Sequence, residues 1–299
     1  MNIIEHCGKC LYQLNHWKEQ KRYLFYRVRC WRRKKDIDGL LSFFAANPLR
    51  SKIPWSTPAF VEQATRRFFY CGSTWQERIA LIEKHVEILE ALLTPEALSD
   101  LYIENKPIIL WQEEYQGQAL LCELAFHAGQ RKEGCLSLSL RLGDLWLYQI
   151  IFWVGGAIEA PRIYIGAIQG LLNGAQTIKE LTKAYFGYRT KNLVFYCLRC
   201  FAAELHCDSI WGVTNQGYYA QNGIRFDRKL KTDFGEFWRE CEGVEAPDKR
   251  FYSMPIAEHR KTMEELKPSK RAQHRKRFEK LDSIQAAIAK SMQALKKSP

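Results

Sequence analysis

The segment whose residue types and spacing most suggest a binding site runs from Arg162 to Ala175. It is typical of a β-strand that runs into a loop containing Gln169, Gly170 and Gly174, followed by the start of a helix. A loop of small residues at a helix start exposes backbone N–H groups, which together with the helix dipole can bind a pyrophosphate. The competing interpretation is that Gly170 and Gly174 only shape an ordinary turn between a strand and a helix. The residues alone leave both interpretations open.

Two CxxC pairs, Cys7/Cys10 and Cys197/Cys200, have the spacing that zinc sites use. The second pair, however, falls within a segment of helical apolar periodicity, where cysteine behaves as a small hydrophobic residue. A thioredoxin-like redox motif should open a helix that follows a strand, and neither pair does so. We therefore expect buried thiols and no metal site.

Other catalytic signatures are missing from the sequence. It contains no nucleophile elbow, Walker loop, HExxH or complete GxGxxG motif, so hydrolase and nucleotide-triphosphatase functions lose their usual support. His85 and His127 have no partners nearby in sequence and are interpreted as structural histidines. Neither Glu123 nor His206 stands out as a general base, so the base stays unassigned.

The strand that leads into the glycine loop belongs to a predicted antiparallel meander of four or five strands. The segments that form it are rich in β-branched and aromatic residues and are separated by glycine-containing turns; they are 108–115, 119–127, 135–141, 145–154 and 162–169. Leucine and serine alternate over 136–140, which indicates one covered and one wetter face. Segment 145–154 lacks this alternation and should be a central strand.

Helical periodicity surrounds this meander. Thr74 and Glu77 form a capping box at the start of a helix that ends before Pro95, and residues 47–58 are predicted to form a loop. Two helices, the second capped by Thr190, and a short buried strand follow the meander, at 178–186, 190–205 and 209–214. The predicted fold class is therefore α+β, with a mixed, mostly antiparallel sheet, an N-terminal helical region and a long basic C-terminal helix.

Composition and charge divide the 299 residues into parts. The apolar share of 46% suits a packed globular protein and excludes a disordered or coiled-coil chain. The net charge of +12 is concentrated in two flanks, 18–35 and 260–299, which carry +8 each, whereas 36–259 carries −4. We expect a basic N-terminal arm (1–39), a main α+β domain (40–257, helical over 60–104 and sheet-containing over 105–257) and a basic C-terminal helix (258–299).

The basic flanks should bind polyanions through long-range attraction and counterion release, and two partners fit: an anionic membrane surface and nucleic acid. At roughly 1 kcal/mol for each well-placed Lys or Arg, the flanks can hold the protein peripherally on anionic lipid without insertion. The residues assigned to this role are Arg32, Arg33, Lys34, Lys35, Lys270, Arg271, Arg275, Lys276 and Arg277.

The cellular compartment is predicted from the absence of membrane-spanning and secretory segments and from the cysteine content. No stretch has the length of a membrane span or the pattern of a secretory signal, and ten scattered cysteines are typical of a reducing compartment. We expect a cytoplasmic protein without a transmembrane segment, peripheral at the inner membrane. The sequence leaves the oligomeric state open.

The strand and glycine loop, placed after an antiparallel meander, resemble the cofactor-binding region of the GNAT-type N-acetyltransferase superfamily. Asn215, Ala220 and residues 222–226 are similar to the region that ends that superfamily's next strand. The spacing from Gln169 to Gly174 is one residue longer than the superfamily pattern, and two helices replace the single one expected.

The GNAT-like resemblance implies acyl-CoA as a cofactor and assigns residues to it. The backbone of Ile165, Ala167 and Gln169 would pair with the pantetheine, and the N–H groups of Gly170, Gly174 and Ala175 would bind the pyrophosphate. Asn215 and Tyr219 would orient the cofactor and the leaving thiolate.

Blocks spread over most of the chain, from about Leu40 to Ile288, are similar to the VirK/YbjX family of Gram-negative bacteria. These blocks are 69–78, 163–170, 186–189, 191–193, 195–201, 237–238 and 270–277. The resemblance implies a role in virulence, in envelope integrity and in resistance to antimicrobial peptides. It supplies no catalytic residues.

Two functions of different classes follow. The first is CoA-dependent acyl transfer at the inner face of the membrane. The second is a non-catalytic adaptor that uses the basic flanks to bind nucleic acid or a membrane. A bulky residue in place of Gly174 should abolish the first function and leave the second nearly unchanged.

Overall fold

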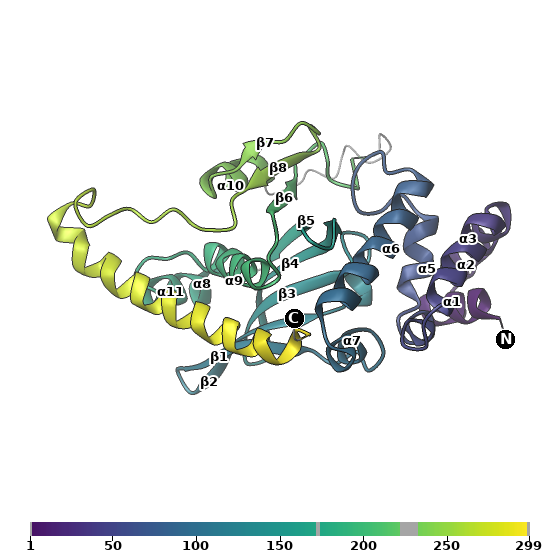
Figure 1. The fold of residues 1–299 in the computed structure, drawn as a ribbon, viewed down its shortest axis with the longest axis horizontal. Helices are drawn as coiled ribbons and strands as arrows, with labels where there is room; N and C mark the ends of the chain where they lie inside the picture. Colours follow the sequence, from purple (N-terminus) through teal and green to yellow (C-terminus); the bar gives the residue numbers. More distant parts are fainter. Residues whose placement is uncertain (1, 172–173, 222–232, 298–299) are drawn as a thin grey trace.

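The structure, a computed structural model, describes residues 2–171, 174–221 and 233–297. These residues form an α+β fold in which helices flank a mixed sheet (Figure 1). The helices are α1 (Ile3–Leu11), α2 (Trp17–Arg32), α3 (Lys34–Ala45), α4 (Ile53–Ser56), α5 (Ala59–Thr65), α6 (Trp75–Leu92), α7 (Pro95–Tyr102), α8 (Ala175–Ala184), α9 (Thr190–Glu204), α10 (Phe234–Glu240) and α11 (Pro268–Leu295). The strands are β1 (Ile108–Tyr115), β2 (Gln118–Ala125), β3 (Leu136–Leu142), β4 (Leu145–Gly156), β5 (Pro161–Gly170), β6 (Ser209–Val213), β7 (Val244–Glu245) and β8 (Phe251–Met254).

The sheet has the strand order β1-β2-β3-β4-β5-β6-β8-β7. Strands β1 to β5 form an antiparallel meander, so this prediction is confirmed. The predicted buried strand is also present as β6, which pairs with β5 in parallel. A parallel pair needs a crossover connection, and α8 and α9 supply it. The sheet is therefore mixed and mostly antiparallel.

The ladder between β5 and β6 is short. It ends at the pair Ile165 and Gly212, although β5 continues to Gly170. The register of β5 against β4 shifts at the same point, where the pairing skips Gly166 and a β-bulge forms. Because a bulge bends its strand and increases its twist, the second half of β5 turns away from β6.

Helices cover both faces of the sheet. Phe152 of β4 contacts Phe201 of α9 on one face, whereas the next residue, Trp153, contacts Phe69 before α6 on the other face. α11 packs along α9 on the first of these faces (Figure 1). The middle of β4 is buried, which explains why its sequence shows no polar alternation.

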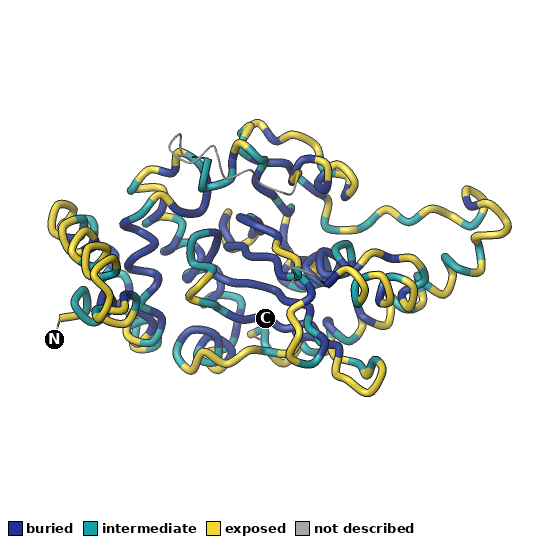
Figure 2. The backbone as a smooth tube through the Cα atoms, turned by 180° about the vertical axis from the view of Figure 1, so that it is seen from behind, coloured by how far each residue is buried: buried dark blue, intermediate teal, exposed yellow. Residues whose placement is uncertain are grey.

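The helical region before the sheet agrees with the sequence in one place and differs in another. The predicted capping box is present at α6, where the Glu77 N–H donates to Thr74 Oγ1 at 3.2 Å and the Thr74 N–H donates to the Glu77 carboxylate at 2.7 Å. The loop predicted over 47–58 is wrong in part, because it contains a 3₁₀ helix (Arg50–Lys52) and α4. Pro54 lies in the first turn of α4, where a helix tolerates proline. α1 to α3 form one end of the molecule, and much of α2 is exposed (Figure 2).

The C-terminal helix differs from the prediction at both ends. Residues 258–267 are not helical, and α11 begins at Pro268, since proline fits a first turn but not a helix interior. The helix ends at Leu295 rather than at the end of the predicted segment 258–299, and the residues around its end contact the end of α6. The Thr94 N–H donates to the Leu295 carbonyl at 2.8 Å, and the Lys297 N–H donates to the Leu92 carbonyl at 2.9 Å.

Candidate functional site

A buried carboxyl group lies where β5 and β6 separate. The Glu133 backbone packs so closely on the bulge that a Cβ at Gly166 would lie 1.8 Å from the Glu133 carbonyl oxygen. The Glu133 residue is 5% exposed, and its carboxylate accepts a hydrogen bond from Tyr218 Oη at 3.1 Å. Tyr219 hydrogen-bonds the same carboxylate, and its ring lies 4.9 Å from the Tyr218 ring, centroid to centroid. We call Glu133, Tyr218 and Tyr219 the Glu133 cluster.

Burial controls the protonation of this carboxyl group. It raises the pKa of Glu133 to about 7, and the hydrogen bonds from Tyr218 and Tyr219 and the charge of Lys132 oppose it only in part. Burial, followed by the nearby Glu133 carboxylate, raises the pKa of the Tyr218 phenol, which therefore remains a hydrogen-bond donor. A carboxyl group with a pKa near neutrality can accept and return a proton at physiological pH, as a general base must.

The loop that carries Glu133 is held by the helical region. Gln63 of α5 donates from Nε2 to two carbonyl oxygens of this loop, both at 2.8 Å, and the Phe69 N–H donates to the Lys132 carbonyl at 2.8 Å. A single glutamate in a turn between two strands carries no motif, so residue types and spacing do not identify Glu133. Only contacts between distant segments bury it and place it at the bulge.

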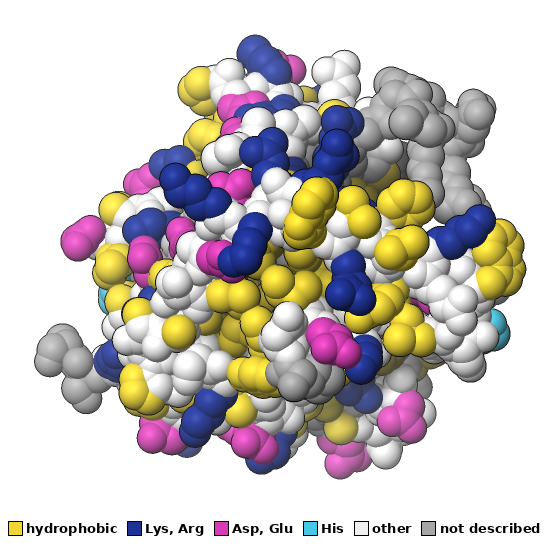
Figure 3. Space-filling view, turned by 90° about the vertical axis from the view of Figure 1, so that its right-hand side faces the viewer, with side chains coloured by type: hydrophobic (Ala, Val, Ile, Leu, Met, Phe, Trp, Pro, Cys, Tyr) yellow, Lys and Arg dark blue, Asp and Glu magenta, His cyan; other side chains and the backbone are white. Residues whose placement is uncertain are grey.

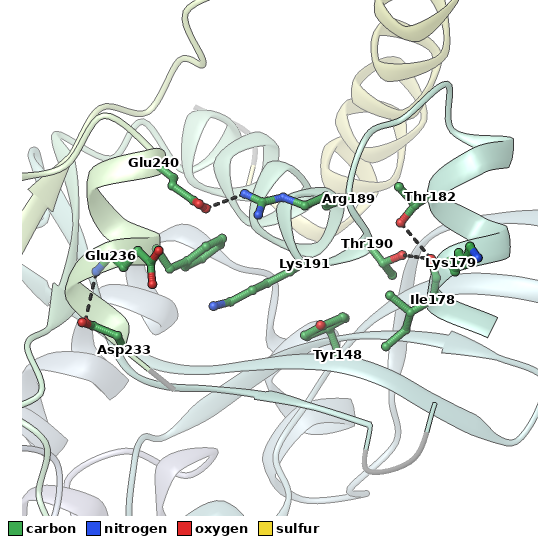
Figure 4. A pocket seen from close by; sticks show the side chains of 11 residues that line it. Tyr148, Ile178, Lys179, Thr182, Arg189, Thr190, Lys191, Asp233, Glu236 and Glu240 are labelled. Carbon is green, nitrogen blue, oxygen red and sulfur yellow. Dashed lines mark hydrogen bonds and ion pairs between the residues drawn. The ribbon is translucent and has the colours of Figure 1, made fainter. Parts of the chain in front are cut away.

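A polar pocket of about 620 Å³ lies near the carboxyl end of β5, between α8, the start of α9 and α10 (Figure 4). The residues that line it come from these three helices, from the N-cap positions of α9 and α10 and from β4; they are Tyr148, Ile178, Lys179, Thr182, Arg189, Thr190, Lys191, Asp233, Glu236, Phe237 and Glu240. Cations from α8 and α9 thus face carboxylates from α10.

The start of α9 gives this pocket an electropositive side. Arg189 forms an ion pair with Glu240, whereas Lys191 Nζ lies 3.8 Å from the centroid of the Phe237 ring. Burial lowers the pKa of Lys191. The predicted N-cap, Thr190, is the first helical residue, and Arg189 takes the cap position without a side-chain hydrogen bond to the helix. The first N–H groups of α9 therefore lack a side-chain cap from Arg189, and together with Lys191 they suit an anion.

A second pocket, of about 380 Å³, shares Tyr148 with the first and is lined by Gln169 and Gly170 of β5. Gly170 packs on Tyr148, because a Cβ at this position would lie 2.7 Å from the tyrosine ring. The strand between the Gly166 bulge and Gly170 covers about 13 Å at roughly 3.3 Å per residue. This part of β5 runs from the Glu133 cluster to the second pocket, which in turn shares Tyr148 with the first.

The remaining residues predicted around the glycine loop do not line either of these two pockets. Ile165 and Ala167 are buried, and Ile165 pairs with β4 and β6. Gly174 is the N-cap residue of α8, and Ala175 is exposed at the start of that helix. A Cβ at Gly174 would lie 2.1 Å from the side chain of Leu171, so a bulky residue would also disturb the start of α8. A substitution there cannot separate a cofactor role from a structural one.

Asn215 and Tyr219, which were predicted to act together, contact different partners. Tyr219 belongs to the Glu133 cluster, whereas Asn215 Oδ1 accepts a hydrogen bond from the Phe234 N–H at 2.8 Å at the start of α10. The predicted loop residues 172–173 and the predicted segment 222–226 lie outside the described residues.

The two basic flanks lie toward opposite ends of the long axis of the molecule (Figures 1 and 2). At the N-terminal end, Arg32 and Lys35 are exposed. Arg33 Nη1 lies 3.8 Å from the Asp36 carboxylate, and Lys34 forms an ion pair with another aspartate of α3. No helix in the described part of the chain has the length and apolar character needed to cross a membrane.

Some of the predicted cations of the second flank are exposed to solvent, whereas others hydrogen-bond to carbonyl groups of the protein. Lys270, Arg275 and Lys276 are exposed on α11. Arg277 Nη2 donates to the Phe186 carbonyl at 2.7 Å, and Arg271 Nε donates to a carbonyl just before α11 at 3.2 Å. The Arg277 contact attaches α11 to the segment between α8 and α9, whereas the Arg271 contact is local. Three of the five predicted cations of this flank therefore remain exposed for a polyanion.

The two CxxC pairs differ in how far their cysteines are buried. Cys197 and Cys200 are buried in α9, and Cys197 hydrogen-bonds Cys122 of β2, which together with burial raises its pKa. In the first pair Cys7 is buried, but Cys10 is exposed, so the prediction of buried thiols is wrong for Cys10. Within residues 2–171, 174–221 and 233–297, no group of three or more His, Cys, Asp or Glu side chains could hold a metal ion.

Comparisons with known proteins give the family. The family described as "Protein of unknown function (DUF535)" matches residues 15–290. The "Uncharacterized protein YbjX" of Escherichia coli K12 is 28% identical over 231 residues, which cover 75% of this chain and 69% of that protein. An "Uncharacterized protein" of Haemophilus influenzae Rd is 23% identical over 281 residues, 91% of this chain and 89% of its own length. No solved structure matches the chain. Because the family match spans most of its length, the chain belongs to the YbjX-like DUF535 family, in agreement with the resemblance of its sequence blocks.

Proposed function

We propose that this protein transfers an acyl group from a CoA thioester to an amine, at the point where β5 leaves β6. The observation that carries the proposal is the Glu133 cluster, a carboxyl group with a pKa of about 7 and two phenol groups beside a β-bulge. Acyl transfer to an amine needs a base whose pKa lies near the working pH. Glu133 fills the role that the sequence left unassigned.

The second half of β5 and the two pockets support a binding path for the acyl donor. Beyond Ile165 the strand no longer pairs with β6, so an extended pantetheine arm can follow it from the bulge toward Gly170. The phosphate groups of CoA are anions, and charge-assisted hydrogen bonds to lysine and to helix N-terminal N–H groups are strong. Lys191 and the start of α9 offer such donors in the 620 Å³ pocket, and Lys179 adds an exposed cation.

The proposed reaction forms a C–N bond and breaks a C–S bond. The acceptor amine attacks the thioester carbonyl carbon, and the Glu133 carboxylate accepts the proton that the amine loses. The Tyr219 hydroxyl donates a proton to the leaving thiolate, and Glu133 then returns its proton to Tyr219. The products are an amide and the CoA thiol, and the cluster ends in its starting protonation state.

The proposed setting is the cytoplasmic face of an anionic membrane. The exposed Arg32 and Lys35 support it, because each well-placed cation near an anionic surface contributes roughly 1 kcal/mol. In the cell, this activity would support envelope integrity, virulence and resistance to antimicrobial peptides, as the VirK/YbjX resemblance suggests. A deletion strain complemented with Glu133→Gln should remain as sensitive to a cationic peptide as the deletion strain itself.

The direct test is calorimetry of acetyl-CoA and a long-chain acyl-CoA with the full chain. Lys191→Ala should weaken binding by about tenfold, the loss expected for one charge-assisted hydrogen bond. Glu133→Gln should bind the thioester but release no CoA thiol when an amine is added. Glu159→Gln, the same substitution in the exposed turn between β4 and β5, is the control and should keep both properties. If neither thioester binds the wild-type protein, the proposal fails.

A second function, a non-catalytic adaptor for nucleic acid or a membrane, is supported by the exposed cations on two separate surfaces. These cations are Arg32, Lys35, Lys270, Arg275 and Lys276. Affinity for duplex DNA or structured RNA that falls steeply with salt would favour this function, and weak binding at physiological salt would count against it.

A further inference from the structure

Large apolar side chains gather on the outer side of one helix, α2. The exposed fractions are 61% for Trp17, 60% for Leu24, 61% for Phe25, 39% for Val28 and 76% for Trp31. Figure 3 faces this end of the molecule and shows hydrophobic side chains grouped together, with lysine and arginine side chains among them. An exposed apolar patch with a polar rim marks an interaction site rather than an ordinary solvated helix face.

Helix geometry places most of these side chains in one stripe. At 100° per residue, the members of the stripe fall within about 60° of one another on the side opposite the buried Tyr26 and Cys30; they are Trp17, Leu24, Val28 and Trp31. The stripe runs for about 21 Å along the helix at 1.5 Å per residue. α2 thus has an inner apolar side that packs on the protein and an outer apolar side that faces solvent.

Basic side chains border the outer stripe. Lys21 and Arg32 lie between it and Phe25, and both are exposed. Lys21 Nζ lies 4.5 Å from the centroid of the Trp17 ring, so charge and apolar surface are in direct contact. The segment 18–35 as a whole carries a net charge of +8.

The positive charge of this surface favours an anionic bilayer over a second copy of the chain as its partner. A second copy of the chain would bring +8 against +8 in a symmetric interface, and like charges placed together are strongly unfavourable. An anionic bilayer offers acidic headgroups to the lysines and arginines and, just below them, an apolar layer to the stripe. Tryptophan and phenylalanine on one side of a helix with Lys and Arg at its edges are typical of helices that lie in this interface.

We propose that α2 is an interfacial helix that lies parallel to an anionic bilayer and inserts Trp17, Leu24, Val28 and Trp31 below the headgroups. Lys21 and Arg32 contact the lipid phosphates at the edge of the stripe. This inference deepens the membrane part of the proposed function and does not depend on acyl transfer. It replaces the expectation of a contact made by charge alone with one that buries apolar side chains.

The test uses the full chain and vesicles of phosphatidylcholine with about 30% phosphatidylglycerol, a composition with a negative surface potential. The double variant Leu24→Ala/Trp31→Ala should lose at least about tenfold in vesicle binding, because two large apolar side chains no longer leave water. Val244→Ala, which truncates another exposed apolar side chain far along the sequence, should bind like the wild type. Brominated acyl chains should quench wild-type tryptophan fluorescence, and Trp17→Phe/Trp31→Phe should abolish the quenching while keeping most of the binding.

Three results would overturn the inference. One is binding without any quenching, which would mean contact through charge alone. Another is equal binding to vesicles of pure phosphatidylcholine. The third is no vesicle binding together with dimers, in sedimentation, that Trp31→Ala disrupts, which would assign the stripe to a second copy of the chain. Calorimetry with acyl-CoA measures the proposed reaction separately, so either proposal can fail while the other stands.

Discussion

Replacing Glu133 with Gln should make the protein more stable at alkaline pH, although the substitution alters a buried, hydrogen-bonded group. Burial raises the pKa of Glu133 from 4.5 to about 7 in the folded protein, whereas water surrounds this carboxyl group in the unfolded chain. The folded state therefore binds the proton more tightly. The stability that this proton contributes is complete below about pH 4.5 and is lost as the pH rises to about 7.

The size of this stability change follows from the pKa values of Glu133 in the unfolded and folded protein. Their difference corresponds to about 3 kcal/mol in the free energy of unfolding, at about 1.4 kcal/mol for each pH unit. The amide that Glu133→Gln introduces would carry no charge and could still accept the hydrogen bond from Tyr218 Oη through its own carbonyl oxygen. Its NH₂ group needs an acceptor, which removes part of the gain. We expect the variant to gain about 2 kcal/mol at about pH 8 and almost nothing at about pH 4.5.

Urea unfolding of the wild type and Glu133→Gln, over a series of pH values between these limits, measures this difference. Glu159→Gln, in the exposed turn between β4 and β5, should show a difference from the wild type that stays constant with pH. A constant difference for Glu133→Gln would show that Glu133 does not titrate in this range and cannot serve as a base near neutral pH. For the proposed acyl transfer, the rate should rise with pH and level off above about 7, where Glu133 is ionised.

Three further predictions concern stability and thiol chemistry. Burial lowers the pKa of His85 to about 3 while its Nδ1 accepts a hydrogen bond from the Val154 N–H at 3.0 Å, so its contribution is present above about pH 6.5 and is lost as the pH falls toward 3. The thermal midpoint of the wild type should fall over this range, and His85→Gln should flatten that part of the curve. Thr74→Ala removes the N-cap of α6 and should lower the free energy of unfolding in urea by about 1 kcal/mol; no change would mean that this cap is dispensable. In the native protein a maleimide should modify the exposed Cys10 before any buried cysteine, as peptide mass spectrometry would show, and early labelling of Cys197 would contradict its burial.

Local sequence was sufficient for most elements of this fold. Runs of β-branched and aromatic residues separated by glycine turns predicted β1 to β5, because these patterns depend on neighbours within a few residues. The same holds for the α6 capping box, whose hydrogen bonds join Thr74 and Glu77 directly. Where the prediction failed, as at 47–58 and 258–267, proline was compatible with both a helix start and a loop, and packing decided between them.

The candidate site was only partly accessible from sequence. Gln169 and Gly170 could be found because they belong to a continuous strand and loop, and they do line a pocket. Tyr219 was also predicted as a site residue, but together with Asn215, whereas in the structure it hydrogen-bonds Glu133. Glu133 could not be found, since its pKa and its position depend on Gly166 and Tyr218, which lie far from it in the chain.

Residue types and short spacings were enough to predict the α+β class, the antiparallel meander, the family and the charge of the two flanks. Packing between distant segments controls which of those charges remain exposed, since Arg277 donates to the Phe186 carbonyl whereas Arg32 faces solvent. The same packing leaves the outer side of α2 uncovered and buries a lone glutamate at the end of the β5–β6 ladder. Burial is a property of contacts between distant segments, and it sets both the pKa of a carboxyl group and the apolar surface that a helix presents to a partner.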